Sequence, residues 1–166
     1  MSWCDLKSLT VDDKNFGVQD YVRAMCNADL VEDDKQKEAD IEVVAREVFK
    51  VSFEKVLRRC GRFLTKLVIE VFKVRVDREI IDTLIKECYN LKYLDMRLQS
   101  FAYDVNDEDL IDLFTPMQKL EHLAIKISDR VNTTFLYVLP CENIKELILL
   151  KPISVPFYKI CHVSIT

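Results

Sequence analysis

Cys161 and His162 stand next to each other in the chain and are the residues best suited to chemistry. A cysteine thiolate beside a histidine is the usual arrangement of a thiol nucleophile. The apolar segment around the pair predicts a strand, however, and neighbouring strand residues point to opposite faces, so the thiol and the imidazole cannot easily make contact. We therefore predict that the protein is not an enzyme and has no catalytic residues.

Metal binding is also not indicated. None of the six cysteines is paired at the spacing of roughly two to four residues that is typical of structural zinc sites, and the chain has two histidines. The segment from Asp104 to Asp112, DVNDEDLID, alternates oxygen ligands as a calcium loop does, but it lacks the glycine and the closing glutamate of such loops. We predict a capped helix start there, with no metal and no cofactor. We expect Cys60, Cys88 and Cys141 to pack as small apolar residues.

The length and composition favour one globular domain. The chain has 166 residues, of which 49% are hydrophobic, and its net charge of −4 is too small to indicate a nucleic acid or a membrane as partner. The basic group Arg58, Arg59 and Arg62 could meet an acidic partner or a phosphate backbone, but it has no interleaved aromatic residues that would stack on bases, and we interpret it as a solvated helix end.

The N-terminus does not resemble a secretion signal, since Asp5 interrupts it where an apolar region would be needed. No apolar run approaches the roughly 18 residues of a membrane span. We therefore expect a cytoplasmic or nuclear protein whose cysteines are reduced.

A leucine pattern, L-x-x-L-x-L, is seen in the segment from Cys88 to Gln99 and occurs four times in all along the chain. It begins at Leu64, Leu91, Leu120 and Ile144, at steps of 27, 29 and 24 residues. These steps lie within or at the edge of the roughly 20 to 29 residues of leucine-rich repeats. The pattern predicts four neighbouring parallel strands over residues 64–69, 91–96, 120–125 and 144–149.

Helical periodicity precedes the strands. Ile80, Ile81, Leu84 and Ile85 fall on one helix face, and residues 110–114 show the same spacing. A helix followed by a strand cannot bury both apolar faces alone, so such units stack and share a core. We predict an α/β fold, a short right-handed leucine-rich-repeat solenoid with a curved parallel sheet on its concave face and helices on its convex face.

Residues 1–166 should form a single domain with four parts. An N-terminal strand in residues 1–12 repeats the leucine pattern, and a helical and acidic insertion covers 13–52, in which Asp29–Asp40 is expected to be a solvated loop. Four regular repeats cover 53–150, and 151–166 form an end strand. An uncapped parallel end strand exposes backbone donors and acceptors, so we expect self-association through the C-terminal edge.

The strand residues that alternate with the buried ones should form an outward grid, in which tyrosine and arginine are the types that commonly dominate binding energy. An ordinary solvated face remains the alternative. The predicted partner-binding residues on this concave face are Lys66, Tyr93, Asp95, Arg97, His122, Lys126 and Glu146.

Four segments carry a resemblance to a known family: the SW-DLK-L opening from Ser2 to Leu9, LRRCGRFLTKL from Leu57, CYNLKYLDM from Cys88 and MQKLEHLAI from Met117. The chain resembles the leucine-rich-repeat part of F-box/leucine-rich-repeat proteins, the substrate receptors of Skp/cullin/F-box ubiquitin ligases. The resemblance implies recognition of a protein substrate, and binding of the Skp adaptor only if an F-box exists upstream of Met1. The alternative is a free-standing repeat interaction protein without a ligase role.

Overall fold

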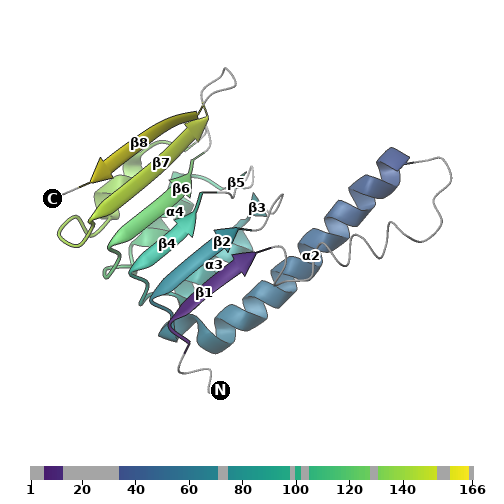
Figure 1. The fold of residues 1–166 in the computed structure, drawn as a ribbon, viewed down its shortest axis with the longest axis horizontal. Helices are drawn as coiled ribbons and strands as arrows, with labels where there is room; N and C mark the ends of the chain where they lie inside the picture. The colour runs from purple at the N-terminus through teal and green to yellow at the C-terminus, as the bar shows by residue number, and fades with distance from the viewer. Residues whose placement is uncertain are drawn as a thin grey trace.

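The repeated leucine pattern forms the strands of one sheet. The computed structural model describes residues 6–12, 34–70, 75–97, 100–101, 105–127, 131–152 and 158–164. Figure 1 shows the strands side by side, and their order is β1 (Ser8–Asp12), β2 (Lys66–Glu70), β4 (Tyr93–Met96), β6 (His122–Lys126), β7 (Glu146–Pro152) and β8 (Tyr158–Ser164). The first five strands are parallel, which confirms the predicted arrangement of the four patterns.

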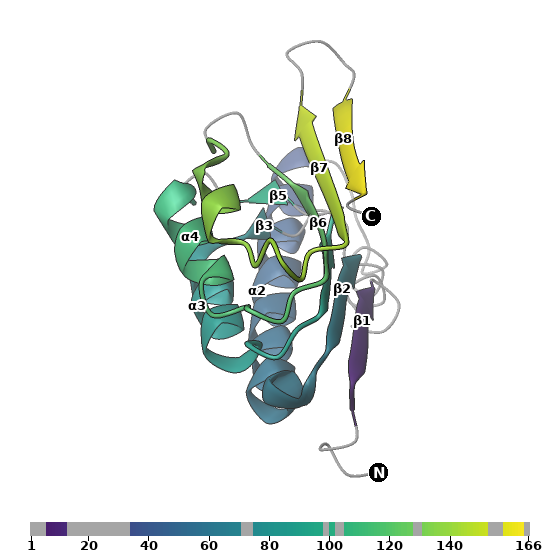
Figure 2. The ribbon, with the colours of Figure 1, turned by 90° about the vertical axis from the view of Figure 1, so that its left-hand side faces the viewer.

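The helices form a second layer on one face of this sheet, as Figure 2 shows. They are α2 (Asp34–Cys60), α3 (Arg78–Glu87) and α4 (Asp107–Phe114), with the short 3-10 helices η2 (Gly61–Phe63) and η3 (Thr134–Val138). A second, two-stranded parallel sheet pairs β3 (Arg75–Val76) with β5 (Ser100–Phe101). Helices connect successive parallel strands, as parallel pairing requires, and the fold is therefore α/β.

The core lies between the two layers. Leu67, Leu94 and Leu123 are in register on neighbouring strands and at most 1% exposed. The predicted helix face of α3 is buried at Ile80, Ile81 and Leu84, with Ile85 packed against it. The equivalent face of α4 is buried at Leu110, Leu113 and Phe114. Both predicted amphipathic helices are thus confirmed.

The strand starts are joined by a repeated backbone contact. The carbonyl of Lys7 accepts hydrogen bonds from the amides of Thr65 and Lys66, at 2.8 and 3.1 Å. The carbonyls of Thr65, Lys92 and Glu121 each accept two amides of the next unit in the same way. Every unit therefore enters the sheet through the same main-chain joint.

Side chains cap the N-termini of α4 and α3. Asn106 caps α4, because its side chain accepts from the amides of Glu108 and Asp109 while the Asp109 carboxylate accepts from the Asn106 amide. This capping box confirms the predicted helix start. In α3, Asp77 accepts from the amide of Ile80 at 3.0 Å.

Part of the expected loop over Asp29–Asp40 is wrong, because residues 34–40 belong to helix α2, while residues 29–33 lie outside the described part of the chain. Helix α2 is one continuous helix that crosses the expected boundary at 52, and Figure 1 shows its N-terminal part extending beyond the sheet. The sequence of this helix contains no glycine or proline that would end it. Phe49, Phe53 and Leu57 are buried and anchor its second half in the core.

The C-terminal strand was expected to be parallel, and this expectation is wrong. Strand β8 runs antiparallel to β7, which itself continues to Pro152 and so crosses the expected boundary at 151. The link of residues 153–157 between the two strands is far shorter than the roughly dozen residues of a parallel crossover. The last repeat also differs, because its helix is the 3-10 helix η3 and not an α-helix.

The cysteines follow the prediction in part. Cys60 and Cys88 are buried, as expected, and burial raises the pKa of both thiols, that of Cys88 to about 12. Cys141 is exposed, so its expected packing is wrong. It lies in the turn that leads to β7, and its thiol contacts the Leu139 carbonyl at 3.4 Å.

Candidate functional site

The sheet face away from the helices carries the predicted grid. Lys66, Tyr93, His122 and Glu146 begin the strands β2, β4, β6 and β7 and are in register with one another. We call these four residues the first column. The parallel register places each residue opposite the equivalent residue of the next unit, as the repeat predicted.

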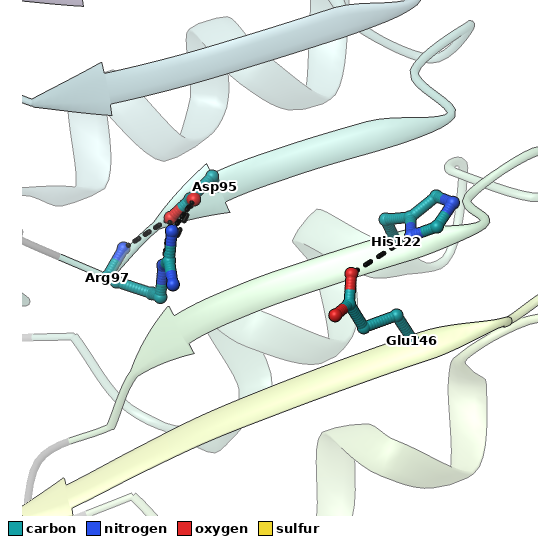
Figure 3. A network of polar contacts seen from close by, with 4 residues as sticks. All are labelled: Asp95, Arg97, His122 and Glu146. Carbon is teal, nitrogen blue, oxygen red and sulfur yellow. Dashed lines mark hydrogen bonds and ion pairs between the residues drawn. The ribbon is translucent and has the colours of Figure 1, made fainter. Parts of the chain in front are cut away.

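The first column is a continuous row of contacts. The Lys66 ammonium lies 4.6 Å from the centroid of the Tyr93 ring, a cation–π distance. The Tyr93 and His122 rings are tilted against each other with centroids 5.5 Å apart. Nδ1 of His122 lies 3.2 Å from Oε2 of Glu146, and Figure 3 shows this pair bridging β6 and β7. The row thus offers a cation, two aromatic rings and a carboxylate in fixed order.

Accessibility differs along this row. Lys66 is exposed and Tyr93 is half-buried, while the side chains of His122 and Glu146 are 35% and 37% exposed. Burial, followed by the charge of Asp95, raises the pKa of Tyr93, which keeps its hydroxyl a hydrogen-bond donor to higher pH. Half-buried rings with reachable polar atoms lose little freedom when a partner covers them.

Asp95 and Arg97 form the second polar group of this face. Arg97 donates to both carboxylate oxygens of Asp95, from Nε at 3.0 Å and from Nη2 at 2.7 Å, and its amide donates to Oδ1 at 3.1 Å. Asp95 is only 5% exposed, and its carboxylate is bound by Arg97. The sequence predicted an exposed carboxylate at this position, and the structure differs. These hydrogen bonds raise the pKa of Arg97.

The two polar pairs lie toward opposite ends of the strands. Figure 3 shows Asp95 and Arg97 near the end of β4, and His122 near the start of β6. Between them, Val68 and Ala124 are buried beside Asp95 in the middle of the sheet. Lys126 is half-buried at the end of β6, in register with Leu150. The predicted residues therefore form two groups and not one patch.

Glu121 was not predicted as a site residue, although it links three units. Its Oε1 binds Nζ of Lys92 at 2.8 Å, and its Oε2 binds Nζ of Lys145 at 2.5 Å. The hydrogen bond from Lys145 and then that from Lys92 lower the pKa of Glu121 to about 2. The signal was present in the sequence, because all three residues directly precede the first column in their own repeats.

Asn90 and Asn143 were also missed. Asn90 donates to the carbonyl of Arg62, and Asn143 donates to the carbonyl of Gln118, both at 2.8 Å. Each asparagine directly precedes the first residue of a leucine pattern and binds the turn of the preceding unit. Alignment of the repeats would have shown that two of four units share this residue.

Within the described residues, no group of three histidine, cysteine, aspartate or glutamate residues is arranged to hold a metal ion. Cys161 and His162 are in register with Leu149 and Ile148, but their side chains lie outside the described part of the structure. None of the helices that the structure describes is long and apolar enough to cross a membrane.

Comparison with known proteins gives no relative for this chain. No family model, no curated protein and no solved structure matches it.

Proposed function

We propose that the protein is a leucine-rich-repeat module that binds another protein on the sheet face away from its helices. The observation that carries this proposal is the first column, in which Lys66, Tyr93, His122 and Glu146 form one row of contacts across four parallel strands. Such a row can contact an extended or flat partner surface through its two aromatic rings and through one positive and one negative charge.

The assignment to leucine-rich repeats rests on three features together. The pattern recurs at steps of 27, 29 and 24 residues, its leucines are in register, and the same backbone joint opens each unit. In a short right-handed solenoid of this kind, the sheet lines the concave face and the helices cover the convex face. The first column would then lie inside the arc.

The residue types favour a protein partner over other ligands. Tyrosine and arginine are enriched where interface residues contribute most to affinity, and Tyr93 and Arg97 are both on this face. Arg97 is also held in place before binding by Asp95, so little side-chain entropy remains to be lost. The mixed charges of the row match neither a nucleic acid backbone nor an anionic membrane.

A role in substrate recognition for a Skp/cullin/F-box ubiquitin ligase is the preferred form of this function, and it rests on the resemblance of the leucine patterns. The alternative is a repeat interaction protein that acts without the ligase. An F-box upstream of Met1 in the gene separates the two forms.

Affinity capture with a matched pair of variants tests the binding face. Tyr93→Ala removes the central ring of the first column, whereas Tyr137→Ala removes a tyrosine that is 89% exposed on η3, in the helix layer. We expect proteins captured by the parent to be lost with Tyr93→Ala and kept with Tyr137→Ala. Equal capture by both variants contradicts the proposal. Recovery of Skp and cullin together with these proteins supports the ligase form, and their absence supports the alternative.

A further inference from the structure

A basic cleft lies at the edge of the sheet where the strands begin. It has a volume of about 300 Å³ and spans the start of the N-terminal strand and three successive repeats. Its lining residues are Lys7, Arg62, Phe63, Thr65, Asn90, Lys92 and Lys119. Four of these seven residues are cations and none is acidic, although the whole chain has a net charge of −4.

The positive charge of the cleft is largely uncompensated. Among the residues that the structure describes, Glu121 is the only carboxylate that forms an ion pair with one of these four cations, and that cation is Lys92. Lys119 donates instead to the neutral Oδ1 of Asn90 at 2.7 Å. The Arg62 guanidinium lies 4.9 Å from the Phe63 ring centroid. Neither of these two contacts neutralises a charge, and Lys7, Arg62 and Lys119 are all exposed to solvent.

The cleft is also held in shape before any ligand arrives. Asn90 binds the Arg62 carbonyl through its amide nitrogen and Lys119 through its amide oxygen, so one side chain fixes two walls. Thr65 donates its hydroxyl to the carbonyl of Lys7 at 3.0 Å, which fixes the third. A pre-organised cationic site loses little entropy on binding an anion.

We infer that this cleft binds an acidic peptide segment of a partner protein, through carboxylates that approach Lys7, Arg62 and Lys119. The same edge already shows how a carboxylate is bound, since Glu121 bridges Lys92 and Lys145. The Phe63 ring and the aliphatic parts of the lysines offer apolar contact to the peptide between its charges. A long polyanion is disfavoured by the net negative charge of the chain.

The cleft is separate from the first column but borders it. Thr65 and Lys92 directly precede Lys66 and Tyr93 in the chain. A partner on the sheet face could therefore extend an acidic segment into the cleft. The inference does not depend on that partner, because the cleft would bind an acidic peptide whether or not the sheet face is occupied.

Fluorescence anisotropy with a labelled peptide of alternating glycine and glutamate tests the inference. The parent should bind this peptide and should not bind the matched peptide of alternating glycine and glutamine. Arg62→Gln and Lys7→Gln should each raise Kd roughly twofold to fivefold. Lys55→Gln, an identical charge change at an exposed position on α2, should leave Kd unchanged. Circular dichroism on each variant confirms that the fold is retained.

Three results would overturn the inference. Equal weakening by all three substitutions would show general charge attraction and no site. Binding of the glutamine peptide as tightly as the glutamate peptide would exclude recognition of carboxylates. Displacement of the peptide by inorganic phosphate, where acetate at equal ionic strength has no effect, would assign the cleft to phosphate and not to carboxylate. Tyr93→Ala should not change Kd, so failure of this site and failure of the proposed function remain distinguishable.

Discussion

At the scale of single residues, strand β4 shows how one segment serves both core and site. Leu94 and Met96 are buried against the helices, while Tyr93 and Arg97 belong to the opposite face. Alternation along a strand predicted this division. It did not predict that Asp95 would be buried, because Arg97 follows β4 in a turn, where its amide and its guanidinium both bind the Asp95 carboxylate. Alternation thus predicts which charged residues lie on a face of the sheet, but it does not predict how far their side chains are exposed to solvent.

Replacement of Leu94 by alanine should destabilise the protein by about 2 to 5 kcal/mol, because the side chain is completely buried and its loss leaves a cavity. Urea denaturation measures the change as a lower midpoint. Val43→Ala, at a position 55% exposed on α2, is the matched control and should change the midpoint little. Equal midpoints for Leu94→Ala and the parent would contradict the core placement.

Cys88 should make the protein less stable in alkali. Burial raises the pKa of its thiol from 9.0 to about 12. Below the unfolded value both states hold the proton and stability is unaffected. Between 9.0 and about 12 the unfolded thiol ionises while the folded one does not, so the free energy of unfolding falls by up to about 1.4 kcal/mol per pH unit.

Urea midpoints at about pH 8 and about pH 10 test this dependence. The decrease between the two values should be smaller in Cys88→Ala than in the parent. Cys141→Ala changes an exposed cysteine and should keep the parent's decrease. An unchanged decrease in Cys88→Ala would assign the alkaline sensitivity to other groups.

At the scale of elements, the helix starts are anchored by polar contacts between units. Lys50 of α2 forms ion pairs with Asp77 and Glu79 at the start of α3, and these contacts raise the pKa of Lys50. Arg78 of α3 binds the buried Asp109 in α4 at 3.0 Å. The helix positions were predictable from periodicity, because apolar spacing is local. These inter-helix contacts were not, because they depend on how far neighbouring units are rotated.

The capping box of α4 gives a test at this scale. Asn106→Ala removes the acceptor of two backbone amides and should cost about 0.5 to 2 kcal/mol of stability. Thermal unfolding followed by circular dichroism measures the loss. Asn132→Ala provides the control, because Asn132 is exposed and contacts α4 through its backbone amide, which the substitution keeps. A similar loss in both variants would show that the cap contributes nothing specific.

At the scale of the whole molecule, the order and direction of the first five strands were predictable, because equal spacing of one pattern implies equal geometry. The direction of β8 was not, since a strand pattern reads alike in both directions. The length of the connection decided it: residues 153–157 can form a hairpin loop but not a crossover. The groups on the sheet face were predictable only in part, because contacts such as that of Tyr93 with His122 depend on register between strands.

Disulfide trapping tests the antiparallel end of the sheet. Glu146 and Ser164 are in register, so Glu146→Cys with Ser164→Cys should oxidise readily in a chain that also carries Cys141→Ser and Cys161→Ser. The pair Glu146→Cys with Tyr158→Cys is the control, because Tyr158 lies opposite Pro152 at the far end. Preferential oxidation of the control pair would indicate a parallel β8.

The expected self-association through the C-terminal edge stays a prediction. Within the described residues, β7 is the sheet neighbour of β8, whose other edge is open. Light scattering should show concentration-dependent association that Val163→Lys reduces, because charge on an edge strand opposes pairing. Val43→Lys, at an exposed position on α2, should leave the association unchanged. A parent that remains monomeric on the order of tens of micromolar would contradict the expectation.

The backbone joint between units has a consequence for how such a chain can change. Lys7, Thr65, Lys92 and Glu121 provide only their carbonyls to it, and the next unit provides two amides. Every residue except proline has both groups, so the joint places no demand on side chains. A gene segment coding for one unit could therefore be duplicated or deleted, and the units on either side would still meet through the same hydrogen bonds. Growth or shortening of the sheet by whole units requires no new contact to evolve.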